Sequence, residues 1–131
     1  MKITLRGAGM VAQSLLYLVA GINHFRSSGT YVAIMPPHYS HPLGWVQFTG
    51  VAEIIGGIGL LIPQTRRAAA WGIVAMLVGY FDVHIYMLQH AADRFANIPV
   101  WLLYVRLPLQ LVLMYWAWVY TRRRTALDSR Y

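Results

Sequence analysis

The stretch GVAEIIGGIGLLIPQTRRAAAWGIVAMLVGY, residues 50–80, decides the fold, because a short polar turn separates two long apolar runs. Pro63 ends the first run, and Arg66 and Arg67 stand at the start of the second. Extended outward, each run reaches about 20 mostly apolar residues, the length that crosses the hydrocarbon core of a bilayer. The turn PQTRR is short, so we expect a tight antiparallel hairpin of two membrane-spanning helices.

Two further apolar runs, one on each side of this hairpin, have a similar length. Of the 131 residues, 58% are hydrophobic and only 11% are charged, against about 25% charged residues in a soluble domain. We therefore expect an all-α fold, an integral membrane four-helix bundle forming a single domain over residues 1–131. The expected spans are residues 7–24, 43–62, 68–90 and 100–121.

Arginine and lysine predict the orientation of this bundle. Eight of them flank one side of the expected spans: Lys2, Arg6, Arg66, Arg67, Arg122, Arg123, Arg124 and Arg130. Only Arg26 and Arg94 lie on the other side. The positive-inside rule then places both termini in the cytoplasm. The net charge of +7 fits anionic lipid headgroups better than nucleic acid, because the basic residues lie in short flanks between apolar runs.

Other features complete the expected organisation. Residues 26–41 form a long outer connection with an apolar core, and we expect it to lie at the membrane interface. The first span ends in GINHF, without the small-residue pattern of a cleavage site, so we expect no cleaved signal peptide. The absence of cysteine excludes disulfides and thiolate metal sites. Small residues four apart predict close helix packing: Ala52 and Gly56, Ala68 and Gly72, Ala75 and Gly79.

Ionisable residues inside the expected spans share one depth. Each costs at least ~2.5–3.5 kcal/mol on insertion scales and therefore needs a reason. At ~1.5 Å per residue, Glu53, Asp82, His84 and Arg106 all fall roughly 9–15 Å from the outer edge. His24 ends the first span on the same side. We expect a polar pocket in the outer leaflet, formed by Glu53, Asp82, His84, Arg106, Gln110, His24 and Gln47.

Several roles for these residues remain open at this stage. Asp82 and His84 point about 200° apart on a helix, so only one of them can face a given neighbour. An ion pair between Glu53 and Arg106 that locks the bundle is the structural alternative to a ligand site. His24 and His84 are candidate ligands of haem or another metal, and His38 and His41 are candidate copper ligands.

Four segments are similar to the DoxX family of small bacterial membrane proteins. They are GINHF, IMPPHY, TGVAEIIGGIGLLIPQTRRAAAWG and RLPLQLVLMYWAW, and together they extend over nearly the whole chain. The resemblance implies a four-helix protein of the bacterial inner membrane, with Glu53 and Arg106 at characteristic polar positions. It also implies a connection to quinone-linked oxidase, thiosulfate-oxidising or oxidative-stress complexes. The third span departs from the family's FPANIYM, because FDVHIYM carries Asp82 and His84 in place of proline and asparagine.

Three functional hypotheses follow. The first is an accessory or stabilising subunit of a membrane redox or respiratory complex, in contact with other membrane subunits or with a second copy. The second is a bundle that binds a quinone, a lipid or another small lipophile. The third is a haem or copper protein that uses the outer histidines. No nucleophile–base arrangement is readable, so a role without catalysis is expected.

Overall fold

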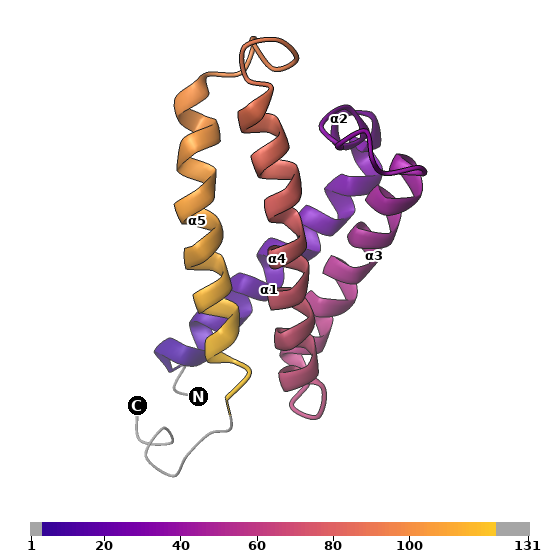
Figure 1. Ribbon diagram of the computed structural model, residues 1–131. Coiled ribbons are helices and arrows are strands. Elements are labelled where there is room, and N and C mark those ends of the chain that lie inside the picture. Colours follow the sequence, from indigo (N-terminus) through magenta and orange to yellow (C-terminus); the bar gives the residue numbers. More distant parts are fainter. Residues whose placement is uncertain (1–3, 123–131) are drawn as a thin grey trace.

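The computed structural model describes residues 4–122, and within this range the chain is all-helical (Figure 1). This confirms the predicted all-α class. The long helices are α1 (Leu5–Arg26), α3 (Pro42–Leu61), α4 (Arg66–Gln89) and α5 (Val100–Val119), whose ends differ from the expected span limits by at most two residues. The short helix α2 (Ser28–Ala33) occupies the connection that the sequence predicts between the first two spans. Lys2, Arg123, Arg124 and Arg130 lie outside the described residues.

Local chemistry sets several helix ends. The Thr4 hydroxyl accepts a hydrogen bond from the Gly7 amide at 3.0 Å, which caps α1. Pro42 is the first residue of α3, where its fixed φ suits a helix start. At the opposite end of α3, the Arg66 Nε donates to the Leu60 carbonyl at 2.7 Å. These contacts satisfy backbone groups that have no partner within their own helix.

The four long helices form two pairs that pack against each other. In Figure 1, α4 and α5 run antiparallel side by side, while α1 crosses them obliquely on the far side. The most extensive helix contact joins α1 to α3, and α3 also packs against α4. The start of α1, the end of α5 and the turn between α3 and α4 lie at one end of the bundle, and α2 and the α4–α5 connection lie at the other.

Glycines make the contact between α1 and α3 close. A Cβ atom on Gly21 would lie 2.7 Å from the Gly50 carbonyl oxygen, and one on Gly57 would lie 2.9 Å from the Ser14 carbonyl oxygen. The Ser14 hydroxyl also donates to the Gly57 carbonyl at 2.5 Å. Of the small residues that the sequence analysis singles out, Gly56 packs on Ile73 of α4. In contrast, the positions of Gly72 and Gly79 face open space, so their spacing does not mark a helix contact.

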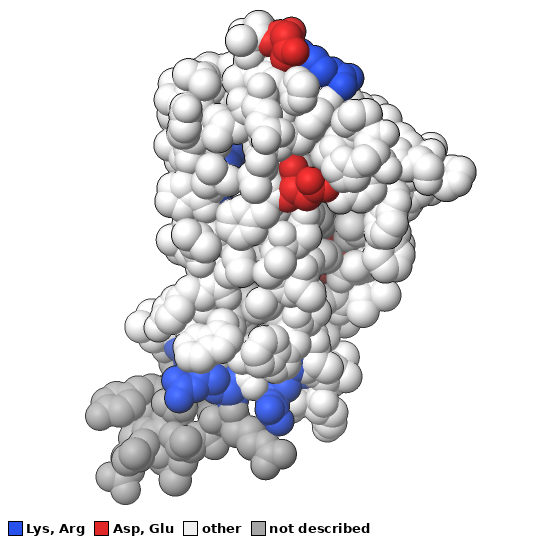
Figure 2. Space-filling view, viewed as in Figure 1, with Lys and Arg blue, Asp and Glu red and all other residues white. Residues whose placement is uncertain are grey.

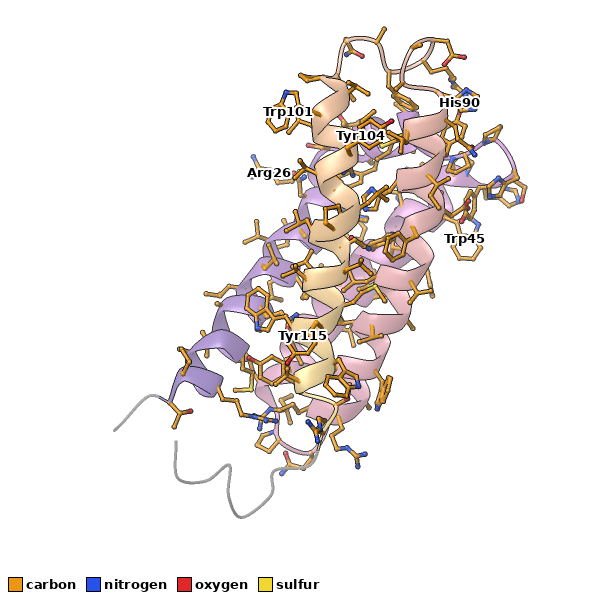
Figure 3. The ribbon with its side chains drawn as sticks, turned by 60° about the vertical axis from the view of Figure 1, so that its left-hand side comes forward. Arg26, Trp45, His90, Trp101, Tyr104 and Tyr115 are labelled. Atoms are coloured by element: carbon orange, nitrogen blue, oxygen red, sulfur yellow. The ribbon has the colours of Figure 1, made fainter. Side chains whose placement is uncertain are left out.

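The outer surface of the bundle suits a bilayer. All four long helices are long and apolar enough to cross a membrane. Large apolar side chains such as Phe48, Val112 and Tyr115 are exposed along their length. In Figure 2 a group of basic residues lies at the end that holds the start of α1 and the α3–α4 turn, and a broad uncharged belt lies above it. Figure 3 places Trp45 and Trp101 toward the opposite end, where an aromatic belt is expected.

The contact between α1 and α3 makes a prediction about stability. A Gly57→Ala variant should unfold at a lower temperature in uncharged detergent, with a loss of about 1–3 kcal/mol, because its methyl group presses on a backbone atom that cannot easily move. A Gly44→Ala variant in the same helix is the control. Its Cβ would make an ordinary 3.7 Å contact, so the midpoint should stay or rise. Equal midpoints for the two variants would contradict this account of the helix contact.

Candidate functional site

A cavity of about 400 Å³ lies between the long helices and is covered in part by the α1–α3 connection. Its walls are mostly apolar and aromatic, with Val46 and Phe48 from α3, Met76 and Val83 from α4, and Tyr31 and Met35 from the connection. Six polar side chains from four helices converge on it: His24, Thr49, Glu53, Tyr80, His84 and Arg106.

Glu53 is the most deeply buried carboxylate of the described residues, with 3% of its surface exposed. The Tyr80 hydroxyl donates to its Oε1 at 2.8 Å. Its Oε2 lies 3.4 Å from the Nε2 of His24, within reach of an ion pair, yet the geometry forms no hydrogen bond. Buried polar atoms are nearly always hydrogen-bonded. The Glu53 Oε2 is therefore an open position on the wall of the cavity.

The partners of His24 determine where its protons lie. Its Nδ1 is 2.9 Å from the Val46 carbonyl oxygen, which can only accept, so Nδ1 carries a proton. The Thr49 hydroxyl lies 3.2 Å from the same nitrogen and donates to the Trp45 carbonyl. With its Nδ1 directed at the Val46 carbonyl, His24 presents its Nε2 to the Glu53 Oε2, 3.4 Å away.

His84 has its protonation pattern set by Gln110. The Gln110 Nε2 donates to the Leu77 carbonyl at 2.6 Å, so the amide oxygen faces His84 Nε2 at 3.3 Å. His84 Nε2 is consequently the donor, and Nδ1 of the neutral ring is an acceptor. This Nδ1 is buried and has no hydrogen-bond partner. The cavity thus has a second open polar position, held in place by α5.

Arg106 is half-buried and carries the guanidinium of the cavity wall. Its Nη1 points at the Met87 sulfur, 3.2 Å away. The ion pair with Glu53 that the sequence left open does not form, and among residues 4–122 no carboxylate stands at ion-pair distance from Arg106. Glu53 is instead engaged by Tyr80 and His24 on the other wall.

Asp82 lies outside the cavity lining, on the exposed side of α4. Its Oδ2 accepts hydrogen bonds from the Tyr39 hydroxyl and stands next to the His38 Nε2, both at 2.8 Å. It therefore fastens the α1–α3 connection to α4. Tyr31 and Tyr39 of this connection line the cavity. Asp82 therefore influences the site by holding the connection in place.

The remaining predicted residues lie apart from the cavity lining. Gln47 is exposed on α3, and His41 is exposed at the start of the same helix. Gln110 touches the site only through His84. Within residues 4–122 no group of three or more His, Asp or Glu side chains is placed to hold a metal ion. The haem and copper alternatives stay predictions.

Sequence reasoning missed Tyr80, which makes the shortest polar contact to Glu53. A signal was present, because Tyr80 precedes His84 by four residues and so shares its helix face. Gln13 and Tyr17 were missed as well. Both are buried on α1, and the Gln13 amide and the Tyr17 hydroxyl have no hydrogen-bond partner among the described residues.

The fold and the site together define an all-helical protein with four helices suited to a membrane and a polar-lined internal cavity. Residues 13–121 match the family described as a domain of unknown function, DUF8561, and the chain belongs to that family. No curated protein matches the chain. No solved structure matches it either.

The contact between Asp82 and the α1–α3 connection predicts how fast a protease cleaves that connection. An Asp82→Asn variant loses the charge that attracts His38 and Tyr39, so trypsin should cleave after the exposed Arg26 several-fold faster than in the unchanged protein. Cleavage after Arg94, in the α4–α5 connection, is the internal control and should keep its rate. Unchanged cleavage at both arginines would show that Asp82 does not hold the connection.

The same contact makes a prediction about alkaline pH. The hydrogen bond to Asp82, together with partial burial, raises the pKa of Tyr39 above its usual 10.0. The attachment is therefore fully present below the ordinary tyrosine pKa and is lost as pH rises through the higher folded value. In ¹³C NMR of labelled tyrosine, Tyr39 should titrate later than exposed tyrosines. Asp82→Asn should move its pKa down, and no movement would contradict the assignment.

Proposed function

We propose that this chain is a multi-pass membrane protein that binds a small lipophilic molecule in the cavity between its helices. The observation that carries the proposal is the Glu53 Oε2, which is buried at the cavity wall without a hydrogen bond. A carboxyl group accepts a hydrogen bond when ionised and donates one when protonated. It can therefore hold a hydroxyl or a carbonyl of a ligand, and quinones are one such class.

The size and lining of the cavity support the same proposal. Small-molecule sites are clefts of roughly 300–1,000 Å³ with mostly apolar walls and a few convergent polar groups. The cavity has about 400 Å³, and Tyr31, Trp45 and Phe48 give it aromatic walls. Glu53 on one side and Arg106 on the other provide polar groups that a ligand can bridge.

The membrane setting of the proposal follows from the charges. Arg6, Arg66, Arg67 and Arg122 belong to the end with the start of α1 and the α3–α4 turn, where Figure 2 shows a group of basic residues. By the positive-inside rule this end faces the cytoplasm, and the cavity opens toward the outer leaflet. The resemblance to the DoxX family supports the bacterial inner membrane as its location.

Single cysteines test this orientation, because the chain contains none of its own. A cysteine at Gln64, in the turn between α3 and α4, should resist a membrane-impermeant maleimide in intact cells and react after lysis. A cysteine at Asp93 should react in intact cells. The reverse pattern would overturn the orientation.

A second candidate is an accessory subunit of a membrane redox complex. A separate apolar groove of about 860 Å³ runs between α3 and α4, and the small residues Ala52, Ala68 and Gly72 are part of its lining. Small-residue surfaces let helices approach closely in lipid. This groove, unlike the cavity, has no ionisable side chain in its lining.

Two glycines of α4 separate the two candidates. Gly79 lines the cavity and Gly72 lines the groove, and a Cβ at either position would meet open space. Leucine at either site should fill that space without a clash, and it has a higher helix propensity than glycine. We expect Gly79→Leu to remove a small molecule that co-purifies with the protein, and Gly72→Leu to retain it. Organic extraction and mass spectrometry measure this directly.

The opposite outcome supports the accessory subunit. If Gly72→Leu releases protein partners under mild detergent, and the extracts of all three proteins contain the same molecules, the groove and not the cavity is the functional surface. Recovery of identical molecules from Gly79→Leu and the unchanged protein would by itself overturn ligand binding in the cavity.

A further inference from the structure

We infer that the ligand of this cavity is an acidic amphiphile whose ionised head is bound by Arg106. This inference rests on the proposed function, and it narrows the ligand to a chemical class that a plain quinone does not meet. It starts from the charges around the cavity, one of which has no counter-ion within the described part of the chain.

Arg106 is the unbalanced charge. A guanidinium within a membrane span is costly unless it pairs or reaches the interface. Its Nη1 contacts only the weak acceptor Met87 Sδ, which is buried with 2% exposure. Arg26 and Arg94, toward the same end of the bundle, are exposed. Arg106 differs from them because it is half-buried and borders the cavity.

The described carboxylates are engaged elsewhere. Glu53 accepts a hydrogen bond from the Tyr80 hydroxyl and lies 3.4 Å from the His24 Nε2. The Asp82 carboxylate contacts His38 and Tyr39 outside the cavity lining. Asp93 lies in the α4–α5 connection beside His90. Among residues 4–122, none of these groups neutralises Arg106, so an anion that enters the cavity would do so.

His84 supports an anion at this position. It borders the cavity close enough to Arg106 for the two side chains to interact electrostatically. Its Nε2 is fixed as a donor to Gln110, and its Nδ1 is unpaired. If His84 is protonated, this Nδ1 is a second donor for an anion in the cavity. Tyr31 lines the same cavity.

The rest of the cavity fits the apolar body of such an acid. Trp45, Phe48, Met76 and Val83 line it, and the Glu53 Oε2 offers one further hydrogen bond. An acid with an aromatic or short aliphatic body would place its carboxylate or phosphate on Arg106 and its body against these walls. An arginine fork matches the planar geometry of a carboxylate and also binds phosphate.

The experiment compares two probes of nearly the same shape, 4-phenylbutyrate and 4-phenylbutyramide. The full chain is purified in an uncharged detergent, and binding is measured by equilibrium dialysis at neutral pH. We expect the acid to bind about tenfold or more tightly than the amide, because a hydrogen bond to a charged group is the stronger one. Gly79→Leu should abolish binding of both probes by filling the cavity. The ester 4-phenylbutyl phosphate, in the same assay, separates a phosphoric from a carboxylic head.

Variants locate the charge that is recognised. Arg106→Gln should erase the preference for the acid, Arg106→Lys should keep part of it, and Arg26→Gln, at an exposed position, should leave it unchanged. Equal binding of acid and amide by the unchanged protein would overturn the inference while keeping the proposed cavity. Binding of neither the acid, the phosphate nor the amide would overturn both. A preference that survives Arg106→Gln would place the recognition elsewhere and also overturn it.

Discussion

The close approach of the α1 and α3 backbones is the constraint on which the site depends. Gly21 and Gly50 let the two helices meet at a point where a Cβ atom on either residue would collide with the other helix. A Cβ on Gly50 would also strike the Cβ of His24 at 2.8 Å. His24 can therefore reach the Val46 carbonyl and Glu53 only because this position has no side chain. The packing of the helices and the geometry of the site have one physical cause.

Once His24 and Glu53 are together, the carboxylate of the cavity is engaged away from Arg106. Glu53 accepts a hydrogen bond from Tyr80 and lies beside His24, whose Nδ1 is held by the Val46 carbonyl. Arg106 on α5 borders the same cavity, and among the described residues no carboxylate lies at ion-pair distance from it. A guanidinium without such a partner favours a ligand with an anionic head.

The depth of the ionisable residues was readable from the sequence, because the helical rise fixes how far each lies from a helix end. Glu53, His24, His84 and Arg106 do border one cavity. Their partners were not readable, because these depend on the rotation of each helix. Asp82 and His84 point about 200° apart, so the sequence predicted that one of them faces away, and only the structure identifies Asp82. The glycines followed the same limit, since Gly56 and Gly79 each follow an alanine by four residues, yet Gly56 packs on Ile73 and Gly79 faces open space.

Asp82 also explains why the stretch FDVHIYM differs from an ordinary apolar span. The two unusual residues serve opposite faces of α4. His84 faces inward and is oriented by Gln110, while Asp82 faces outward and binds the connection between α1 and α3. That connection brings Tyr31 and Tyr39 to the cavity. Because Asp82 faces outward and binds this connection, no carboxylate lies at ion-pair distance from Arg106 among the described residues. The same segment thus holds part of the cavity lining in place and leaves the Arg106 charge available to a ligand.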